Sequence, residues 1–352
     1  MFVAWRDLRF ARGRFALMGS VIVLITLLVG LLSGLTAGLA RDNTSALTGL
    51  PADHLAFGRP AAGQSVSFTG STVTPDQWRG LAGRPGVASA EPIGIRTLNA
   101  DAGRQTAAVS VFGVRPDSGL APDATAPGTV VLATKAADEL GAGTGDEITL
   151  GGTTLTVAAV SGDASYSHTP VVWTDLGDWQ SLARSAGATV VALRTSGADL
   201  PAADGAAGTE TKDIEGALSA IGSYQAENGS LQLMRGFLFV ISALVVGAFF
   251  TVWTIQRSAD IAVLKALGSS TGYLLRDALG QAVLMLVGGT AVGTGLAALI
   301  GAFVPDGVPF VLEPLTAIGP AAVMTVLGLV GAALSIRRIT AVDPLTALGS
   351  AR

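Results

Sequence analysis

The sequence predicts an α-helical membrane protein with four transmembrane helices and an α+β domain between the first helix and the second. Hydrophobic residues make up 49% of the 352 residues and charged residues only 14%, and the mean hydropathy is +0.54, which is too apolar for a soluble globular protein. The apolar residues also gather in four blocks of about 20 or more, the length that crosses a bilayer. Residues 41–230, by contrast, have the composition of an ordinary soluble domain.

The first apolar block covers residues 15–40 and follows a basic, amphipathic segment at residues 1–14. A secretory signal has a shorter apolar region, of about 7–15 residues, so we interpret this block as a retained helix and not as a cleaved signal. The other three predicted transmembrane helices cover 231–255, 273–304 and 318–336.

The basic residues beside these helices predict their orientation, because Lys and Arg accumulate in short cytoplasmic segments. They are Arg6, Arg9, Arg12 and Arg14 before the first helix, Arg257, Lys265 and Arg276 between the second and third, and Arg337, Arg338 and Arg352 at the end. Residues 1–14, 256–272 and 337–352 are therefore predicted to be cytoplasmic. The connection 305–317 holds no basic residue and is expected outside, as is the domain at 41–230.

Within residues 41–230, short runs of alternating or β-branched residues are separated by turns rich in Gly, Asp and Pro. The runs cover 65–68, 107–114, 128–132, 147–150 and 154–160. Residues 75–82 and 135–140 have helical patterns, and Thr74-Pro75-Asp76 is typical of a helix start. A last helix, 213–224, is expected to continue into the second transmembrane helix. This mixture predicts an extracytoplasmic α+β domain.

Small residues recur every four positions in two of the predicted membrane helices. They are Gly30, Gly34 and Gly38 in the first helix and Gly289, Gly293, Ala297 and Gly301 in the third. Such ridges let another helix approach closely, either within one subunit or between subunits. A permease with four helices and no internal duplication needs a second copy to enclose a path, which favours a homodimer through the first and second helices.

The sequence offers no enzyme active site. It has no phosphate-binding Gly-x-x-x-x-Gly-Lys-Ser/Thr motif and no Gly-Lys pair, so energy from ATP would come from a partner. The protein has no cysteine and two histidines, without a Gly-x-Ser-x-Gly or His-Glu-x-x-His motif. A net charge of −4 gives no sign of a nucleic-acid partner. We therefore expect no catalytic residues, no metal site and no intrinsic cofactor.

Residues 253–268 form an amphipathic pattern between the second and third membrane helices. Within it, Asp-Ile-Ala-Val-Leu-Lys-Ala-Leu-Gly-Ser-Ser at 260–270 resembles the signature of FtsX/MacB-type ABC transporter permeases. The segment Ser-Ile-Arg-Arg-Ile-Thr-Ala-Val-Asp-Pro-Leu-Thr-Ala-Leu at 335–348 is similar to the end of the same family. This family more often has Glu where the present chain has Asp260.

The resemblance implies a MacB-like fold and a homodimer in the bacterial plasma membrane, paired with two copies of a separate ATPase that binds ATP and Mg²⁺. It also implies that the segment after the second membrane helix is the coupling helix that meets this ATPase. The coupling residues would be Asp260, Ile261, Leu264, Lys265, Leu267 and Gly268.

Three further strings resemble the DevC/Hrt-type permeases, which include haem exporters: Ala-Trp-Arg-Asp-Leu-Arg-Phe at 4–10, residues 33–47, and Leu-Pro-Ala-Asp at 50–53. The resemblance implies haem as transported cargo. Haem iron takes His, Tyr or Met as axial ligands, and its propionates attract cations. The candidate residues are Tyr224, Met234, Arg235, Arg41, His54, Tyr166 and His168.

Each candidate also has an ordinary structural explanation, since interfacial Tyr and Arg residues anchor membrane helices and Met fills cores. Two other functions stay open. One is export of a lipid, lipoprotein or antimicrobial peptide by the same kind of permease. The other is mechanotransmission to an external hydrolase without a cargo path, as in cell-division FtsX relatives.

Overall fold

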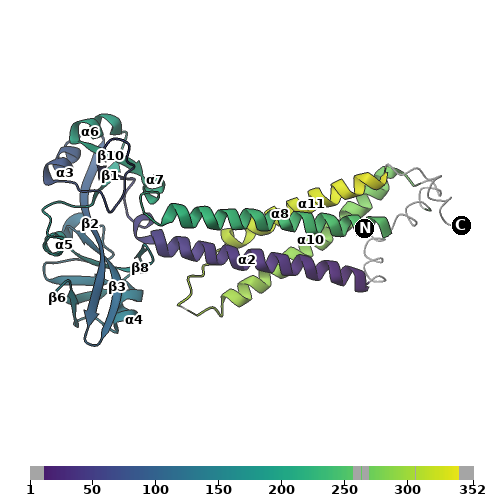
Figure 1. Ribbon diagram of the computed structural model, residues 1–352, viewed down its shortest axis with the longest axis horizontal. Coiled ribbons are helices and arrows are strands. Elements are labelled where there is room, and N and C mark those ends of the chain that lie inside the picture. The colour runs from purple at the N-terminus through teal and green to yellow at the C-terminus, as the bar shows by residue number, and fades with distance from the viewer. Residues whose placement is uncertain (1–11, 257–262, 264–268, 306, 341–352) are drawn as a thin grey trace. The chain divides into compact units, whose positions relative to one another are not determined.

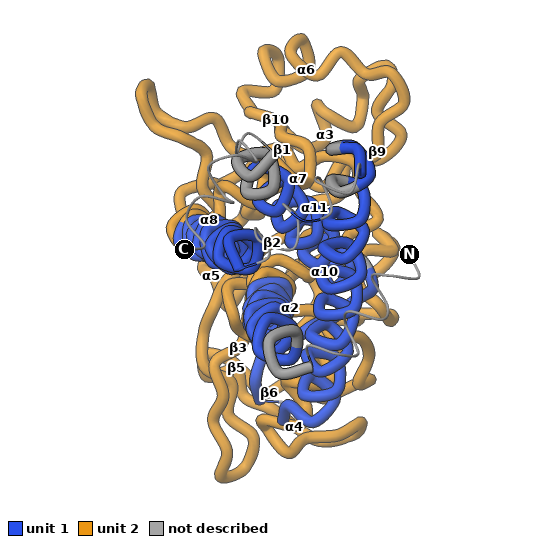
Figure 2. Tube along the Cα trace, turned by 90° about the vertical axis from the view of Figure 1, so that its right-hand side faces the viewer, with its two compact units in different colours: residues 1–38, 230–352 blue, residues 39–229 orange. Residues whose placement is uncertain are grey.

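A computed structural model describes residues 12–256, 263, 269–305 and 307–340. The chain divides into two compact units, shown in different colours in Figure 2. The helical unit comprises Met1–Gly38 and Ser230–Arg352, and the α+β unit comprises Leu39–Gly229. Helices α2 and α8 each contribute residues to both units.

The helical unit is built from four long apolar helices, which are labelled in Figure 1. They are α2 (Arg12–Thr48), α8 (Tyr224–Gln256), α10 (Thr271–Gly301) and α11 (Pro314–Thr340). Each contains a window long and apolar enough to cross a membrane. The prediction of four transmembrane helices is therefore confirmed.

The small-residue ridges of α2 and α10 face partners inside the helical unit. A Cβ added at Gly30 would lie 2.8 Å from the side chain of Ala297. A Cβ at Gly34 would meet the ring of Phe310, and the amide of Val311 donates a hydrogen bond of 3.0 Å to the Gly34 carbonyl. Of the two alternatives that the sequence left open, these glycines serve packing within the subunit.

We expect Gly293→Ala to lower the thermal unfolding midpoint of the detergent-solubilised protein. An added methyl at Gly293 would lie 2.7 Å from the backbone oxygen of Val23 and 2.7 Å from the Cβ of Thr26. Overpacking of this kind costs about 1–3 kcal/mol. Gly295→Ala, two residues further along α10, is the matched control because nothing lies within 4 Å of its Cβ position. Equal midpoints for the two variants would contradict this packing.

The α+β unit contains one large mixed sheet with the strand order β10-β1-β9-β2-β3-β8-β4-β6-β5, and β7 pairs with β8. The strands are β1 (His54–Gly58), β2 (Val87–Ala102), β3 (Gln105–Val114), β4 (Thr129–Leu132), β5 (Glu147–Leu150), β6 (Thr153–Val160), β7 (Ser165–Tyr166), β8 (Thr169–Asp175), β9 (Val190–Thr195) and β10 (Thr209–Asp213). The helices are α3 (Pro75–Ala82), α4 (Thr134–Leu140), α5 (Leu176–Ala183), α6 (Leu200–Ala207) and α7 (Ile214–Leu218), with a 3₁₀ turn at Pro116–Ser118. The predicted α+β class is confirmed.

Two predicted elements are wrong. Residues 65–68 form no strand, although Val66 and Phe68 are buried in a core, so their alternation came from burial without strand pairing. The helix predicted at 213–224 ends at Leu218, and a separate helix, α8, starts at Tyr224. The predicted helix 75–82 coincides with α3, whose Thr74 and Gln77 form a capping box.

The sheet buries a separate apolar core on each face, because successive side chains of a strand point to opposite sides. In β3, Val109 and Val111 belong to one core, which is covered by residues of α3, α4, α5 and α6. Phe112 and Val114 belong to the other, which includes Leu47 near the end of α2. The end of α2 is thus part of the second core, and this placement organises the candidate site.

On the first face, the indole of Trp179 fills the space that two glycines of the sheet leave free. Gly94 of β2 and Gly113 of β3 lie opposite each other in the sheet. A Cβ at Gly94 would lie 2.1 Å from the ring of Trp179, and one at Gly113 would lie 2.2 Å from the Trp179 side chain. This paired absence of side chains lets α5 lie close to the strands.

Candidate functional site

The candidate site lies where the end of α2 meets the hairpin between β7 and β8, all within the α+β unit. The two hairpin turn residues, Ser167 and His168, both have positive φ angles of 50° and 64°. This region costs a residue other than glycine about 1–2 kcal/mol. The turn amides donate hydrogen bonds to α2, from Ser167 to the Asn43 carbonyl at 3.0 Å and from His168 to the Asp42 carbonyl at 3.2 Å.

A second pair of hydrogen bonds fixes the same hairpin to α2. The Ser165 amide donates to Oγ of Ser45 at 2.8 Å, and that hydroxyl donates to the Ser165 carbonyl at 3.2 Å. The strained turn is therefore held by four hydrogen bonds to one helix. Its geometry directs the His168 side chain to a position beside α2.

His168, Asn43, Ser223 and Glu227 form a cluster of polar side chains, which we call the Glu227 cluster. His168 Nε2 lies 2.8 Å from Oε2 of Glu227. The Asn43 amide nitrogen donates to the same carboxylate oxygen at 3.1 Å and lies 3.3 Å from His168 Nε2 and 3.5 Å from the Ser223 hydroxyl. Asn43 is buried, whereas the His168 and Glu227 side chains are 33% and 42% exposed. A ligand could therefore reach the His168 imidazole and the Glu227 carboxylate, which the buried Asn43 amide holds in place.

Two ion pairs extend from the neighbouring residues of α2. Arg41 pairs with Asp163, and Asp42 pairs with Lys135 of α4 at 3.0 Å. Successive residues of a helix point about 100° apart, so Arg41, Asp42 and Asn43 reach three different partners. Both pairs are partly exposed, so each adds little to stability. They place two cations on the α+β unit beside the end of α2.

Among the residues predicted to bind cargo, the structure brings His168 into the Glu227 cluster and Arg41 onto the same end of α2. Tyr224 begins α8 and packs partly buried against the second core. His54 lies instead in β1, where its Nδ1 is 3.3 Å from the Thr195 hydroxyl. Met234, which is 48% exposed, and Arg235 belong to α8 in the helical unit.

Tyr166 is a core residue. Its ring packs edge-on against Phe68 and Phe112, with centroids 5.6 Å away in both cases. Burial raises the pKa of its phenol above the usual range. The phenolate, which is the form that binds iron, is therefore harder to form here than on an exposed tyrosine.

Asn43 and Glu227 were not among the predicted site residues. Glu227 carried a signal in the sequence, because it is the one carboxylate between Glu215 and Asp260 and it lies just before a predicted membrane helix. Asn43 carried none. The predicted coupling residues, Asp260, Ile261, Leu264, Lys265, Leu267 and Gly268, lie outside the described residues.

Comparison with known families decides the assignment. The family described as MacB-like periplasmic core domain matches residues 16–209, and the family described as FtsX-like permease C-terminal matches residues 233–344. The chain is an FtsX/MacB-type ABC transporter permease. Curated relatives of this permease include a putative hemin transport system permease protein, HrtB, of Staphylococcus haemolyticus, 27% identical over 99% of both chains. An HrtB of Staphylococcus epidermidis is 26% identical over 99% of both chains.

The permease is also similar to an uncharacterized ABC transporter permease of Mycobacterium tuberculosis, with 26% identity over 82% of both chains. Among solved structures, the extracellular domain of the noncanonic ABC-type transporter YknZ from Gram-positive bacteria matches at a TM-score of 0.36 with 14% identity. That match covers 46% of the permease and 98% of the YknZ chain. The periplasmic region of MacB from Actinobacillus actinomycetemcomitans matches at 0.36 with 10% identity, over 48% of the permease and 92% of that chain.

We expect Asn43→Ala to loosen the hairpin between β7 and β8. The substitution removes the buried amide that donates to Glu227 and leaves His168 with one partner fewer. Losing a hydrogen bond to a charged group costs about 1.5–3 kcal/mol. Hydrogen exchange of the full-length permease should therefore be faster in peptides that contain Ser167 and His168. The matched control is Asn99→Ala, at an exposed position of β2, and equal exchange in both variants would contradict this role.

Proposed function

We propose that this permease exports haem, driven by a separate ATPase subunit. The observation that carries the proposal is the similarity to the hemin transport permeases along 99% of both chains, although the identity is only 26–27%. The protein works as a homodimer with two ATPase copies, which bind ATP and Mg²⁺. It contributes no catalytic residue itself, and membrane lipid surrounds its helices.

The chemistry of the Glu227 cluster supports this cargo. An imidazole nitrogen is a common axial ligand of haem iron, and the His168 ring is partly exposed beside a carboxylate. Arg41 and Lys135 supply positive charge for the two propionates. Each cation is paired with an Asp, so a propionate would have to displace that Asp carboxylate before it could bind the cation. Tyr224, at the start of α8, is a second candidate ligand.

Haemin titration of the purified permease in nanodiscs tests the cargo. The Soret band should shift saturably, and His168→Ala should weaken binding by about tenfold or more, the order of loss found when a metal site is disturbed. His54→Ala is the matched control, because His54 contacts Thr195 and no member of the Glu227 cluster. Glu227→Gln and Tyr224→Ala show whether a carboxylate or a phenol shares the site.

Two outcomes would contradict parts of this proposal. If both histidine variants still bind haemin saturably with unchanged affinity, the Glu227 cluster is not the haem-binding site. Partition of haemin equal to that of empty nanodiscs would remove haem as cargo. ATP hydrolysis by the reconstituted complex then separates the alternatives, since stimulation by a peptide or lipid indicates another cargo. Stimulation by an external hydrolase alone indicates mechanotransmission.

The proposal includes an orientation, with both termini in the cytoplasm, the α+β unit outside the plasma membrane and the segment 256–272 meeting the ATPase. The protein has no cysteine, so a single introduced thiol reports its own side of the membrane. Ala61→Cys, at an exposed position of the α+β unit, should react with an impermeant maleimide on intact cells. Ser350→Cys should react only after permeabilisation. Labelling in the opposite order would contradict the orientation.

A further inference from the structure

Arg235 of α8 stands at the edge of a long stretch without charge. Residues 236–256, which complete the helix, include no Asp, Glu, Lys, Arg or His, and the sequence continues with Arg257. At a rise of about 1.5 Å per residue this stretch is roughly 31 Å long, which matches the hydrocarbon core of a bilayer. When α8 crosses a membrane, Arg235 therefore lies at the phosphate layer of the leaflet on the side where the helix begins.

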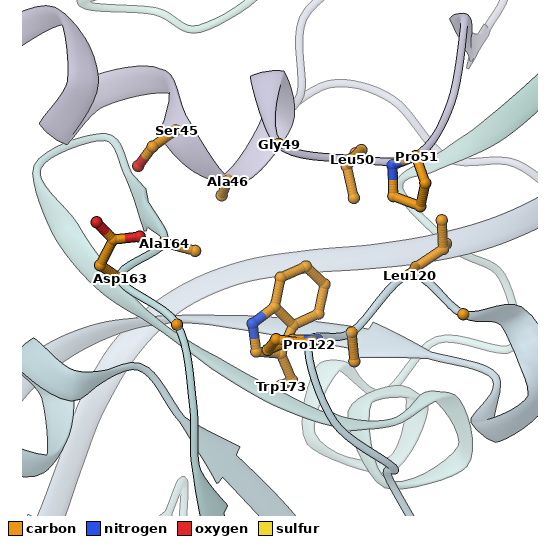
Figure 3. A pocket seen from close by; sticks show the side chains of 13 residues that line it. Ser45, Ala46, Gly49, Leu50, Pro51, Leu120, Pro122, Asp163, Ala164 and Trp173 are labelled. Atoms are coloured by element: carbon orange, nitrogen blue, oxygen red, sulfur yellow. The ribbon is translucent and has the colours of Figure 1, made fainter.

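The guanidinium of Arg235 has no counter-charge among the described residues. Other arginines have one: Arg41 pairs with Asp163, which Figure 3 shows in the wall of a cavity of the α+β unit, and Arg115 pairs with Glu91. No ion pair or side-chain hydrogen bond between described residues includes Arg235. An unpaired cation is costly at the edge of an apolar layer. Arg235 is thus available to an anionic group.

Arg235 lies at the border between the packed and the exposed sides of α8. Ser242 and Val246 follow it by seven and eleven residues, about two and three turns, so the three share one face of the helix. Both of these residues are buried, and Val246 belongs to the core of the helical unit. Arg235 is half-buried, whereas Leu233 and Phe237 on the other side are 62% and 60% exposed. The guanidinium therefore has an apolar, lipid-facing surface beside it.

A second polar side chain accompanies the guanidinium. Gln232 precedes Arg235 by three residues, so the two side chains are neighbours on the helix surface. Gln232 is exposed, and its amide makes no hydrogen bond to another described residue. Nothing lies within 4 Å of a Cβ added at Gly236, which leaves room beside Gln232. An arginine fork binds phosphate through two parallel hydrogen bonds, and an amide NH₂ can donate to a further phosphate oxygen.

We propose that Arg235 and Gln232 bind the phosphate of an anionic phospholipid in this leaflet. The depth of Arg235 along α8 selects a lipid phosphate, because that is the anion present at this layer. A lipid with a net negative charge fits better than a zwitterionic one, since no described carboxylate pairs with Arg235 and could receive an ammonium group. The site follows from the length and charge of α8 and does not rest on haem as cargo.

Photocrosslinking beside Arg235 tests the occupant. Phe239 lies four residues after Arg235, so p-benzoylphenylalanine in its place reaches the acyl chains of a lipid held by the guanidinium. The full-length permease is irradiated in nanodiscs that contain equal amounts of phosphatidylglycerol and phosphatidylcholine with identical acyl chains, and mass spectrometry identifies the crosslinked lipid. Phosphatidylglycerol should be enriched about tenfold or more, the factor that corresponds to a hydrogen bond between charged groups. Arg235→Gln should remove this enrichment.

The matched control is Arg104→Gln, which removes the same charge at an exposed position between β2 and β3 and should keep the enrichment. Equal crosslinking of the two lipids in the protein that retains Arg235, or equal loss in both variants, would overturn the site. The first of these comparisons does not depend on the folding of a variant.

Two competitors separate a membrane lipid from other anions. Free glycerol phosphate should leave the enrichment unchanged, and its loss would indicate a site for a soluble phosphate ester instead of a lipid. One equivalent of haemin should also leave it unchanged. Displacement of the lipid by haemin would assign Arg235 to the cargo site and overturn this proposal, whereas failure of haemin to bind anywhere would contradict only the proposed cargo.

Discussion

Burial of the end of α2 in the second core is the contact on which the candidate site of the α+β unit depends. Ala46, Leu47 and Leu50 are 2%, 0% and 7% exposed, so this helix end is fixed by apolar packing. Polar residues that precede them in α2 then face defined partners. Arg41, Asp42 and Asn43 reach an aspartate, a lysine and the Glu227 cluster, while Ser45 holds β7. One buried helix end thus positions the Glu227 cluster.

The Glu227 cluster presents the His168 imidazole and the Glu227 carboxylate beside the buried side-chain amide of Asn43. This combination of groups suits charged or metal-bearing ligands. The cluster lies against α2, which is also one of the helices able to cross a membrane.

The sequence predicted the elements whose signals are local. Apolar length identifies the four membrane helices, and the Thr74 start signal identifies α3. It failed where a pattern had two causes. Val66 and Phe68 alternate because they are buried, not because they pair, and the residues after Leu218 leave the helix before α8 begins. The coupling segment was predicted from family resemblance and lies largely outside the described residues.

The candidate site was predictable only in part, for the same reason. His168 and Arg41 belong to residue types that bind haem, so chemistry alone suggested them. Asn43 and Glu227 are brought together from α2 and α8 by the fold, and their distance of 184 positions along the chain hides the contact.

The glycines of α2 have a mechanical consequence. Gly30, Gly34 and Gly38 share one face and fit against Ala297, Phe310 and the backbone of Pro309. A rotation of the helix by one residue would bring Leu31, Leu35 and Leu39 to those contacts, where no space exists for them. The helix is therefore fixed against rotation about its own axis within the helical unit.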